Sequence, residues 1–203
     1  MIYYSLIYSH LLYGIPIWGN ANEVHISPLY ILQKKAIRLI VNKDKSIQTL
    51  FKLPGEHESY WYIDTFVKPS SSPLFTELGI LKLYDIFKVS TLLFVYESLN
   101  ELNPTQFHSY FNFPYMTRNT AANRSSNLEV PPARTSTYGL KSIKFTGTKL
   151  WNELGQEERI VASKNVFKIN MKKRFINNNN NPNNNNNLIT FNRPFVSRWD
   201  ELT

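Results

Sequence analysis

The segment that most constrains the fold runs from Pro73 to Asn100, PLFTELGILKLYDIFKVSTLLFVYESLN. We expect a short helical turn, capped by Ser72 and ended at Gly79, and then a long helix from about Lys82 to Leu99. One stripe of this helix carries apolar side chains at spacings of three and four, widened by two leucines: Ile86, Val89, Leu93 and Tyr96, with Leu92 and Leu99. Three more apolar residues lie outside the stripe, namely Phe87, Phe94 and Val95. Such a helix must be covered on several sides, so the sequence predicts an α-rich core around it.

Five further segments have helical periodicity or a helix-start signal: Ile2–Leu12, Ser27–Val41, Asn103–Phe111, Leu140–Leu154 and a last helix capped by Ser163. In the second of these, the expected buried side is Leu29, Leu32, Ala36, Leu39 and Ile40, and a basic exposed side carries Lys34, Lys35 and Arg38. In the last helix, the residues expected to face inward are Val166, Phe167, Met171 and Phe175. Residues 114–134 lack a helical period and are expected to form a loop.

The predicted fold is therefore all-α or α-dominated, with a helical core, a basic helix–loop appendage and a disordered Asn-rich tail. Residues 1–51 and 73–112 form the core, joined by an insertion or long loop at 52–72. The basic appendage is 113–175. From Asn177 to Asn187 every residue is Asn except Pro182, so we expect the tail 176–203 to be disordered.

The uncharged N-terminal segment, Met1 to Asn22, could be a signal peptide, a membrane span or a buried helix. It has no basic n-region and no small-x-small cleavage site, which argues against a secretory signal. Polar residues, Gly14 and Pro16 interrupt a stretch that is barely long enough to cross a bilayer. We expect a buried helix, with membrane attachment through residues 1–18 as the less favoured alternative.

The charge balance indicates the kind of partner. Lys and Arg number 23 against 15 acidic residues, which gives a net charge of +8 and a pI near 9.5. Such a balance favours anionic partners, such as nucleic acid or acidic lipid. The chain has no cysteine, which excludes a disulfide framework and a thiolate nucleophile. This favours an intracellular location, nuclear or cytoplasmic.

Catalytic groups are not clustered in the sequence. The aspartates lie far apart, at Asp44, Asp64, Asp85 and Asp200, whereas two-metal nucleotidyl transfer needs carboxylates that converge. The only acidic pair, Glu157–Glu158, is expected to be solvated surface. The histidines share no metal-ligand spacing, and there is no Gly-rich phosphate loop or nucleophile elbow. We expect no catalytic residues, metal, cofactor or small-molecule substrate.

The positive charge is concentrated in the second half of the chain. Between Phe113 and Phe175 there are twelve Lys and Arg against four Glu, an excess equal to the net charge of the whole chain. Three aromatic residues, Tyr115, Tyr138 and Phe145, are interleaved with these cations. Cations neutralise phosphates and aromatic rings stack on unpaired bases, so the pattern indicates nucleic-acid binding. The alternative is that the lysines solvate helices and that Phe145 and Trp151 belong to the core.

Seven blocks taken in order resemble the C-terminal part of reverse transcriptases from non-LTR, LINE-type retrotransposons of the jockey kind. They are YYSLIYSHLLYGIPIWG (3–19), LYILQKKAIRLI (29–40), the Pro73–Asn100 segment, TRN (117–119), PPARTST (131–137), SIKFTGTKLWNEL (142–154) and SKNVFKINMKKRF (163–175). The SHLLYG-x-x-x-WG and KLWN-x-L strings are the most specific. Most of residues 3–175 is covered.

The resemblance implies that residues 1–51 are thumb-like helices and that 113–175 is the region after the polymerase domain. A thumb grips the template–primer duplex, which would give Lys34, Lys35 and Arg38 a role in contacting the nucleic-acid backbone. In the downstream region the corresponding candidates are Arg118, Arg134, Lys141, Lys144 and Lys149. The family's aromatic-x-Asp-Asp motif, which holds the catalytic metals, has no counterpart here. The 52–72 insertion, Gly155 in place of a proline and the Asn-rich tail also depart from the family.

From this resemblance we expect a truncated fragment of an RNA-directed DNA polymerase that has no catalysis of its own. It would retain nonspecific binding of RNA or DNA through phosphate contacts. A second reading is an inert, decayed gene product whose exposed core surface causes self-association.

Overall fold

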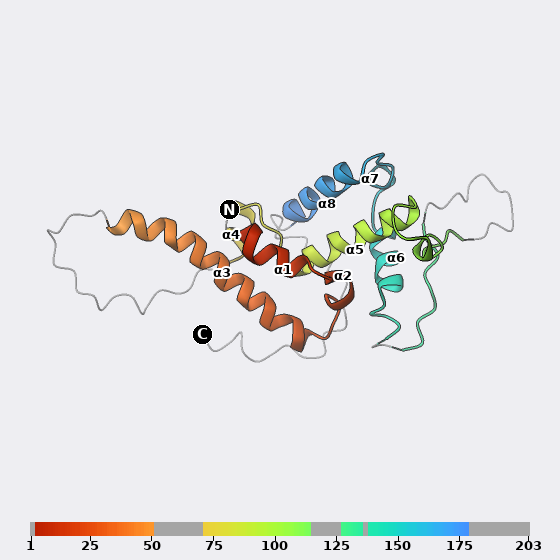
Figure 1. Ribbon diagram of the computed structural model, residues 1–203, viewed down its shortest axis with the longest axis horizontal. Helices are drawn as coiled ribbons and strands as arrows, with labels where there is room; N and C mark the ends of the chain where they lie inside the picture. The colour runs from red at the N-terminus through yellow and green to blue at the C-terminus, as the bar shows by residue number, and fades with distance from the viewer. Residues whose placement is uncertain (1–2, 51–70, 115–126, 136–137, 179–203) are drawn as a thin grey trace.

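The computed structural model describes residues 3–50, 71–114, 127–135 and 138–178 (Figure 1). Within these ranges every regular element is a helix, which confirms the predicted helix-dominated fold. In chain order they are η1 (Tyr3–Tyr8), α1 (Ser9–Leu12), α2 (Ile15–Trp18), α3 (Glu23–Leu50), α4 (Ser72–Glu77), α5 (Leu83–Leu99), η2 (Thr105–Phe107), α6 (Ile143–Asn152), α7 (Gln156–Arg159) and α8 (Lys164–Asn178).

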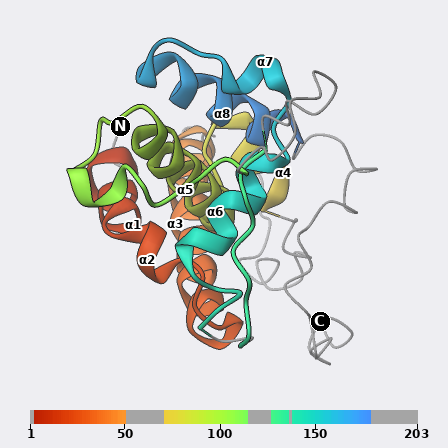
Figure 2. The ribbon, with the colours of Figure 1, turned by 90° about the vertical axis from the view of Figure 1, so that its right-hand side faces the viewer.

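Helix α5 is the centre of the fold, as predicted, and it begins and ends within one residue of the expected bounds. Eleven of its seventeen residues are buried, so it is covered on nearly every side. It packs against α2, α6 and α8 and also contacts α1 and α3. Figures 1 and 2 show the other helices arranged around it. The burial follows from the sequence, because a helix with apolar residues almost all round is unstable in contact with water.

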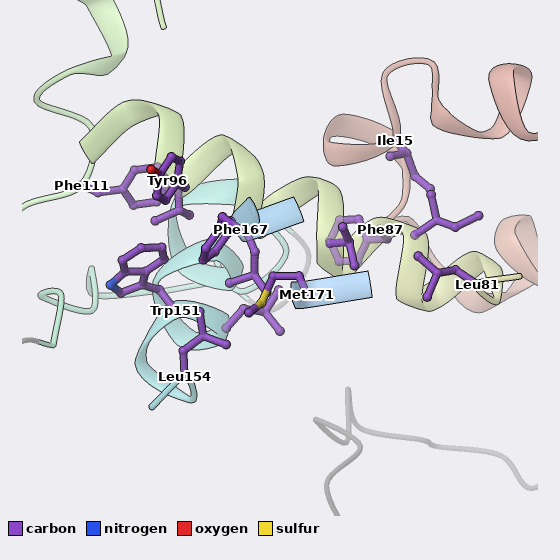
Figure 3. Close-up of a cluster of buried hydrophobic side chains, with 14 of the residues drawn as sticks. Ile15, Leu81, Phe87, Tyr96, Phe111, Trp151, Leu154, Phe167 and Met171 are labelled. Atoms are coloured by element: carbon purple, nitrogen blue, oxygen red, sulfur yellow. The ribbon is translucent and has the colours of Figure 1, made fainter. Parts of the chain in front are cut away.

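The main hydrophobic cluster lies where α5 meets α2, α6 and α8 (Figure 3). Phe167 and Met171 of α8 are fully buried, and the Phe167 ring stacks on Tyr96 of α5 at a centroid distance of 4.7 Å. Trp151 of α6 lies 6.0 Å from the same Phe167 ring. The KLWN and NVFKINM segments, far apart in sequence from α5, therefore belong to the same core as the central helix.

Helix α6 approaches α5 closely because Gly147 has no side chain. A Cβ atom built at this position would lie 2.9 Å from Cγ2 of Val95 and 3.2 Å from the Phe111 ring. A glycine inside a helix costs about 1 kcal/mol relative to alanine. Here the cost is offset by the close packing that the glycine permits.

A buried glutamine joins α3 to the central helix. Gln33 is 1% exposed, and its Nε2 donates to the Tyr3 hydroxyl at 2.8 Å and to the Leu81 carbonyl at 3.0 Å. Its Oε1 accepts the Leu83 N–H, in the first turn of α5, at 2.9 Å. Each buried partner is thereby hydrogen-bonded, as a buried polar group requires. This amide links the main cluster to a smaller one formed by Tyr3, Ile37, Phe75 and Ile80.

Two expectations for α3 are wrong. The helix begins at Glu23 instead of Ser27, with Pro28 inside its first turns, and it continues through Lys43 and Lys45 to Leu50. Leu32 and Leu39, expected inside, are 58% and 72% exposed. The buried side is Ile26, Gln33 and Ile37, with Tyr30 and Ile40 partly buried. The apolar residues of this helix fit two faces, and packing against η1, α4 and α5 selected the face that contains a polar glutamine.

The N-terminal segment is helical but less buried than expected. Tyr4, Ile7, Tyr8 and Leu11 pack on the hydrophobic clusters, whereas Tyr13 and Ile17 are almost fully exposed. Gly14, in the left-handed conformation at φ 62°, separates α1 from α2, as its place before Pro16 suggested. None of the helices in the described part of the chain is both long enough and apolar enough to cross a membrane.

The helix expected at Asn103–Phe111 is reduced to the single turn η2. The Asn103 amide does not cap a following helix. Instead its Nδ2 donates to the Phe94 carbonyl at 3.3 Å and to Ser98 Oγ at 3.1 Å, on the last turns of α5. The asparagine therefore closes the end of α5, and the chain continues without regular structure to Phe111.

The expected loop is confirmed over 127–135, where no regular element forms. Asn152, the last residue of α6, holds this segment with both side-chain atoms: Oδ1 accepts the Leu128 N–H at 2.8 Å and Nδ2 donates to the Leu128 carbonyl at 2.9 Å. This places Leu128 in the core. In α8 the inward side is as expected except at Val166, which is 47% exposed. Residues 51–70, which hold most of the expected 52–72 insertion, and residues 115–126 lie outside the described residues, as does the expected tail from residue 179 on. The expectation that the tail is disordered from residue 176 is wrong for 176–178, because α8 continues to Asn178 and Ile176 packs on the main cluster.

Replacing Gly147 with valine should destabilise the protein by about 1–3 kcal/mol, because the new side chain overpacks the α5–α6 contact. Urea unfolding followed by helical circular dichroism measures this. Gly155→Val is the matched control, since a Cβ at Gly155 meets only Glu158 Oε2, at 3.7 Å. The control should stay within about 0.5 kcal/mol of the wild type. Equal effects of the two changes would contradict the close approach.

Gln33→Met keeps the side-chain volume but removes three hydrogen bonds. We expect a loss of about 1–3 kcal/mol for each partner that stays buried without a replacement. The change is measured as a lower urea midpoint, with Gln106→Met, on the exposed turn η2, as the control. A variant as stable as the wild type would show that the amide is not needed to hold α3 on α5.

Candidate nucleic-acid interface

Three of the predicted cations lie on or just before α6. Lys149 is exposed, and its Nζ lies 4.7 Å from the centre of the Phe145 ring. Lys144 is half-buried with its Nζ 5.4 Å from the Tyr110 ring. Such cation–π contacts leave the ammonium charge in place, while the rings orient it. Phe145 is half-buried and Trp151 is 4% exposed, so the expectation that both could be core residues holds for Trp151.

The segment before α6 is fixed to the start of α3. The buried Asn20 amide donates to the Lys141 carbonyl at 2.9 Å and to Thr146 Oγ1 at 3.0 Å. The Lys141 ammonium in turn donates to the Asn22 side chain. Two asparagines that carry no charge therefore decide where Lys141 lies. Nothing in their local sequence indicates this role, since their partners are more than a hundred residues away.

The second group of predicted cations follows the outer side of α3. Lys34 Nζ lies 4.2 Å from the Tyr30 ring centre, Lys35 is exposed and Arg38 is half-buried. Sequence reasoning missed Lys82, which the fold brings to this group: burial lowers the pKa of its ammonium, Asp85 opposes the shift and Lys34 adds to it. Nothing in the sequence around Lys82, which directly precedes α5, indicates that this lysine lies near Lys34 of α3.

The structure does not merge the two groups into one patch. Lys141 contacts Asn22, directly before α3, and Lys34 follows twelve residues later. At 1.5 Å per residue the two positions are about 18 Å apart along the helix axis. Arg134 is exposed in the 127–135 segment, and Arg118 lies outside the described residues. We therefore treat Lys34, Lys35 and Arg38 as the α3 group and Lys141, Lys144 and Lys149 as the α6 group.

Several other cations of the basic region are occupied by internal partners. Lys164 forms an ion pair with Glu97 at 2.5 Å, and Arg174 forms one with Glu158. Arg159 donates to Asn127 Oδ1 at 2.9 Å. The sequence excess of +8 therefore overstates the charge that is available to a ligand. Glu158 also accepts the Gly155 N–H, so only Glu157 of the acidic pair is the solvated residue that the sequence predicted.

Acidic and histidine side chains do not converge. In the described residues no group of three or more His, Asp or Glu could hold a metal ion. Asp85 is buried beside Lys82 and Tyr30. Burial lowers the Lys82 pKa and the charge of Asp85 opposes this shift, whereas burial raises the Tyr30 pKa and Asp85 adds to it. Asp85 thus partly neutralises Lys82, the lysine that the fold brings beside the α3 group.

No protein-family model, curated protein or solved structure matches this chain.

Tyr30 provides a test of the α3 group's environment. Burial, with a smaller contribution from Asp85, raises the Tyr30 pKa from 10.0 to about 12. The folded state therefore favours the neutral phenol, and this contribution to stability is complete below pH 10 and is lost as pH rises towards about 12. Tyr30→Phe keeps the ring under Lys34 but removes the titrating group. We expect the wild type to lose stability relative to this variant between pH 10 and 12, measured by urea unfolding at each pH. A constant difference would show that the phenol is not shielded from water.

Proposed function

We propose that this chain is a nonspecific nucleic-acid-binding fragment that corresponds to the thumb and post-polymerase region of a LINE-type reverse transcriptase. It has no polymerase activity of its own, because the region it resembles does not carry the catalytic aspartates. The α3 and α6 groups contact phosphates of RNA or DNA. The family assignment rests on the sequence blocks, of which SHLLYG-x-x-x-WG and KLWN-x-L are the most specific.

The observation that carries the binding proposal is the placement of the α6 group. Lys141 and Lys144 hold their ammonium groups against an asparagine oxygen and a tyrosine ring. Lys149 lies over the Phe145 ring and also interacts electrostatically with the Glu153 carboxylate. Lys164 and Arg174, by contrast, are paired with Glu97 and Glu158. A phosphate can therefore approach Lys141 and Lys144 without displacing a carboxylate from these two contacts, and counterion release then favours binding.

The blocks that resemble the family also explain much of the fold. Trp151 and Asn152 of the KLWN string join the core and hold Leu128, and Gly19 of the WG pair leaves room for Phe87 and Ile15. These residues of the two most specific strings therefore have roles in packing. Three of the blocks that resemble the family, residues 3–19, 73–100 and 142–154, contribute side chains to the main core of this chain.

The test is binding of the purified chain to labelled single-stranded RNA and to a primer–template duplex over a range of salt concentrations. Neutralising the α6 group with Lys141→Gln, Lys144→Gln and Lys149→Gln should weaken binding. It should also lower the slope of log affinity against log salt by roughly 2–3. Circular dichroism establishes that the triple variant is folded.

The matched control removes the same charge from α8, with Lys164→Gln, Lys168→Gln and Lys173→Gln. We expect a smaller loss, because Lys164 is already paired with Glu97. Equal losses would mean that net charge alone governs binding. A folded wild type that binds neither ligand at low salt would make the basic residues ordinary surface and the resemblance a record of ancestry.

A second candidate is an inert product that self-associates, and the exposed apolar residues favour it. Val24, Leu32 and Leu39 of α3 are each more than half exposed. Exposed apolar side chains promote association where they form a contiguous patch. Light scattering at increasing protein concentration separates the two candidates. A species that grows with concentration, does not bind nucleic acid and is dispersed by Leu32→Glu with Leu39→Glu would support the inert product.

A further inference from the structure

Tyr138 presents its ring to solvent at the start of the α6 group. It is 84% exposed, although tyrosine usually buries much of its ring. Among the described aromatic residues, Tyr13 is similarly exposed, at 86%. Tyr138 is the one of the two that adjoins predicted phosphate-binding cations, with Arg134 four residues before it and Lys141 three residues after it.

The ring is carried on a hydrogen-bonded turn. Thr135 accepts the Gly139 N–H with both its carbonyl, at 3.1 Å, and its Oγ1, at 2.9 Å, and the Leu140 N–H also reaches the Thr135 carbonyl. Ser142 Oγ then donates to the Gly139 carbonyl at 2.8 Å and accepts the Phe145 N–H of α6. These bonds connect the turn directly to the first turn of α6.

The turn is also anchored to the opposite end of the chain, through the bonds from Asn20 and Asn22 to Lys141. Figures 1 and 2 both show the loop before α6 beside the start of α3. A ring held on such a turn loses less conformational freedom on binding than one on an unanchored chain. Tyr138 thus combines an exposed, anchored ring with cations that are close to it in sequence. Proteins that bind single strands combine cations for the backbone with aromatic rings on which bases stack.

We propose that Tyr138 stacks on an unpaired base of a single-stranded nucleic acid whose phosphates are held by Arg134, Lys141 and Lys144. This inference rests on the proposed nucleic-acid binding and adds a ligand class to it. In a duplex the bases are stacked on one another, so an aromatic ring cannot stack on them. In a single strand every base has a face that a ring can reach. The site therefore favours single strands over blunt duplex.

The experiment compares ligands that carry the same number of phosphates. Anisotropy titrations use oligouridine, oligothymidine and an abasic strand, each of about 15 nucleotides, and a blunt duplex of about half that length, so that its two strands together carry about the same number of phosphates. The wild type should bind the two base-bearing strands about fivefold or more tightly than the abasic strand. Tyr138→Ala should remove that preference and Tyr138→Phe should keep it. The uridine and thymidine strands show whether RNA or DNA is the better ligand.

Tyr13→Ala is the matched control, because it removes an equally exposed ring outside the α6 group. It should leave the preference unchanged. The stacking role would be overturned if the preference for base-bearing over abasic strands survived Tyr138→Ala, or if the wild type showed no such preference. If all four ligands still bound in a salt-dependent way, the proposed function would stand. A folded protein that binds none of the ligands would overturn both. Circular dichroism of each variant confirms that the helices are intact.

Discussion

The fold depends on covering α5. This helix has apolar side chains almost all round, so α2, α6 and α8 must pack on different sides of it at once. The requirement explains why segments as distant as Ile15, Trp151 and Phe167 meet in one cluster (Figure 3). It also explains why Gly147 stands inside a helix, since a larger residue would keep α6 from reaching α5.

Apolar packing alone does not fix how the covering helices are oriented, and buried amides add that information. Gln33 joins α3 to the N-terminus of α5, Asn20 joins the end of α2 to the segment before α6, and Asn152 joins α6 to Leu128. Each amide matches backbone groups that would otherwise be buried without partners, so a different arrangement would leave them unsatisfied. The same bonds place Lys141 and the Tyr138 turn beside α3, which ties the candidate interface to the architecture.

Counting charged residues along the sequence does not show which of them are available to a ligand in the folded protein. The excess of cations in 113–175 is a count along the sequence, and such a count treats Lys164 and Arg174 as equivalent to Lys144. Folding pairs the first two with Glu97 and Glu158 and leaves Lys144 against a tyrosine ring. It also brings Lys82 to Lys34, from a segment in which no basic cluster could be seen. Pairing between distant residues is a property of the fold, and no local pattern encodes it.

The sequence by itself determined the central helix, its bounds and its burial, because strong periodicity, Pro73 and Gly79 act locally. It also determined the helical character of α6 and α8. Only the tertiary structure decided which face of α3 is buried, since Leu32 and Leu39 fit a helical stripe as well as Ile26, Gln33 and Ile37 do. It decided too that Asn103 closes α5 instead of starting a helix. For α3, the hydrogen bonds of Gln33 to Tyr3, Leu81 and Leu83 select the buried face. For Asn103, hydrogen bonds to Phe94 and Ser98 of the preceding helix replace the expected cap.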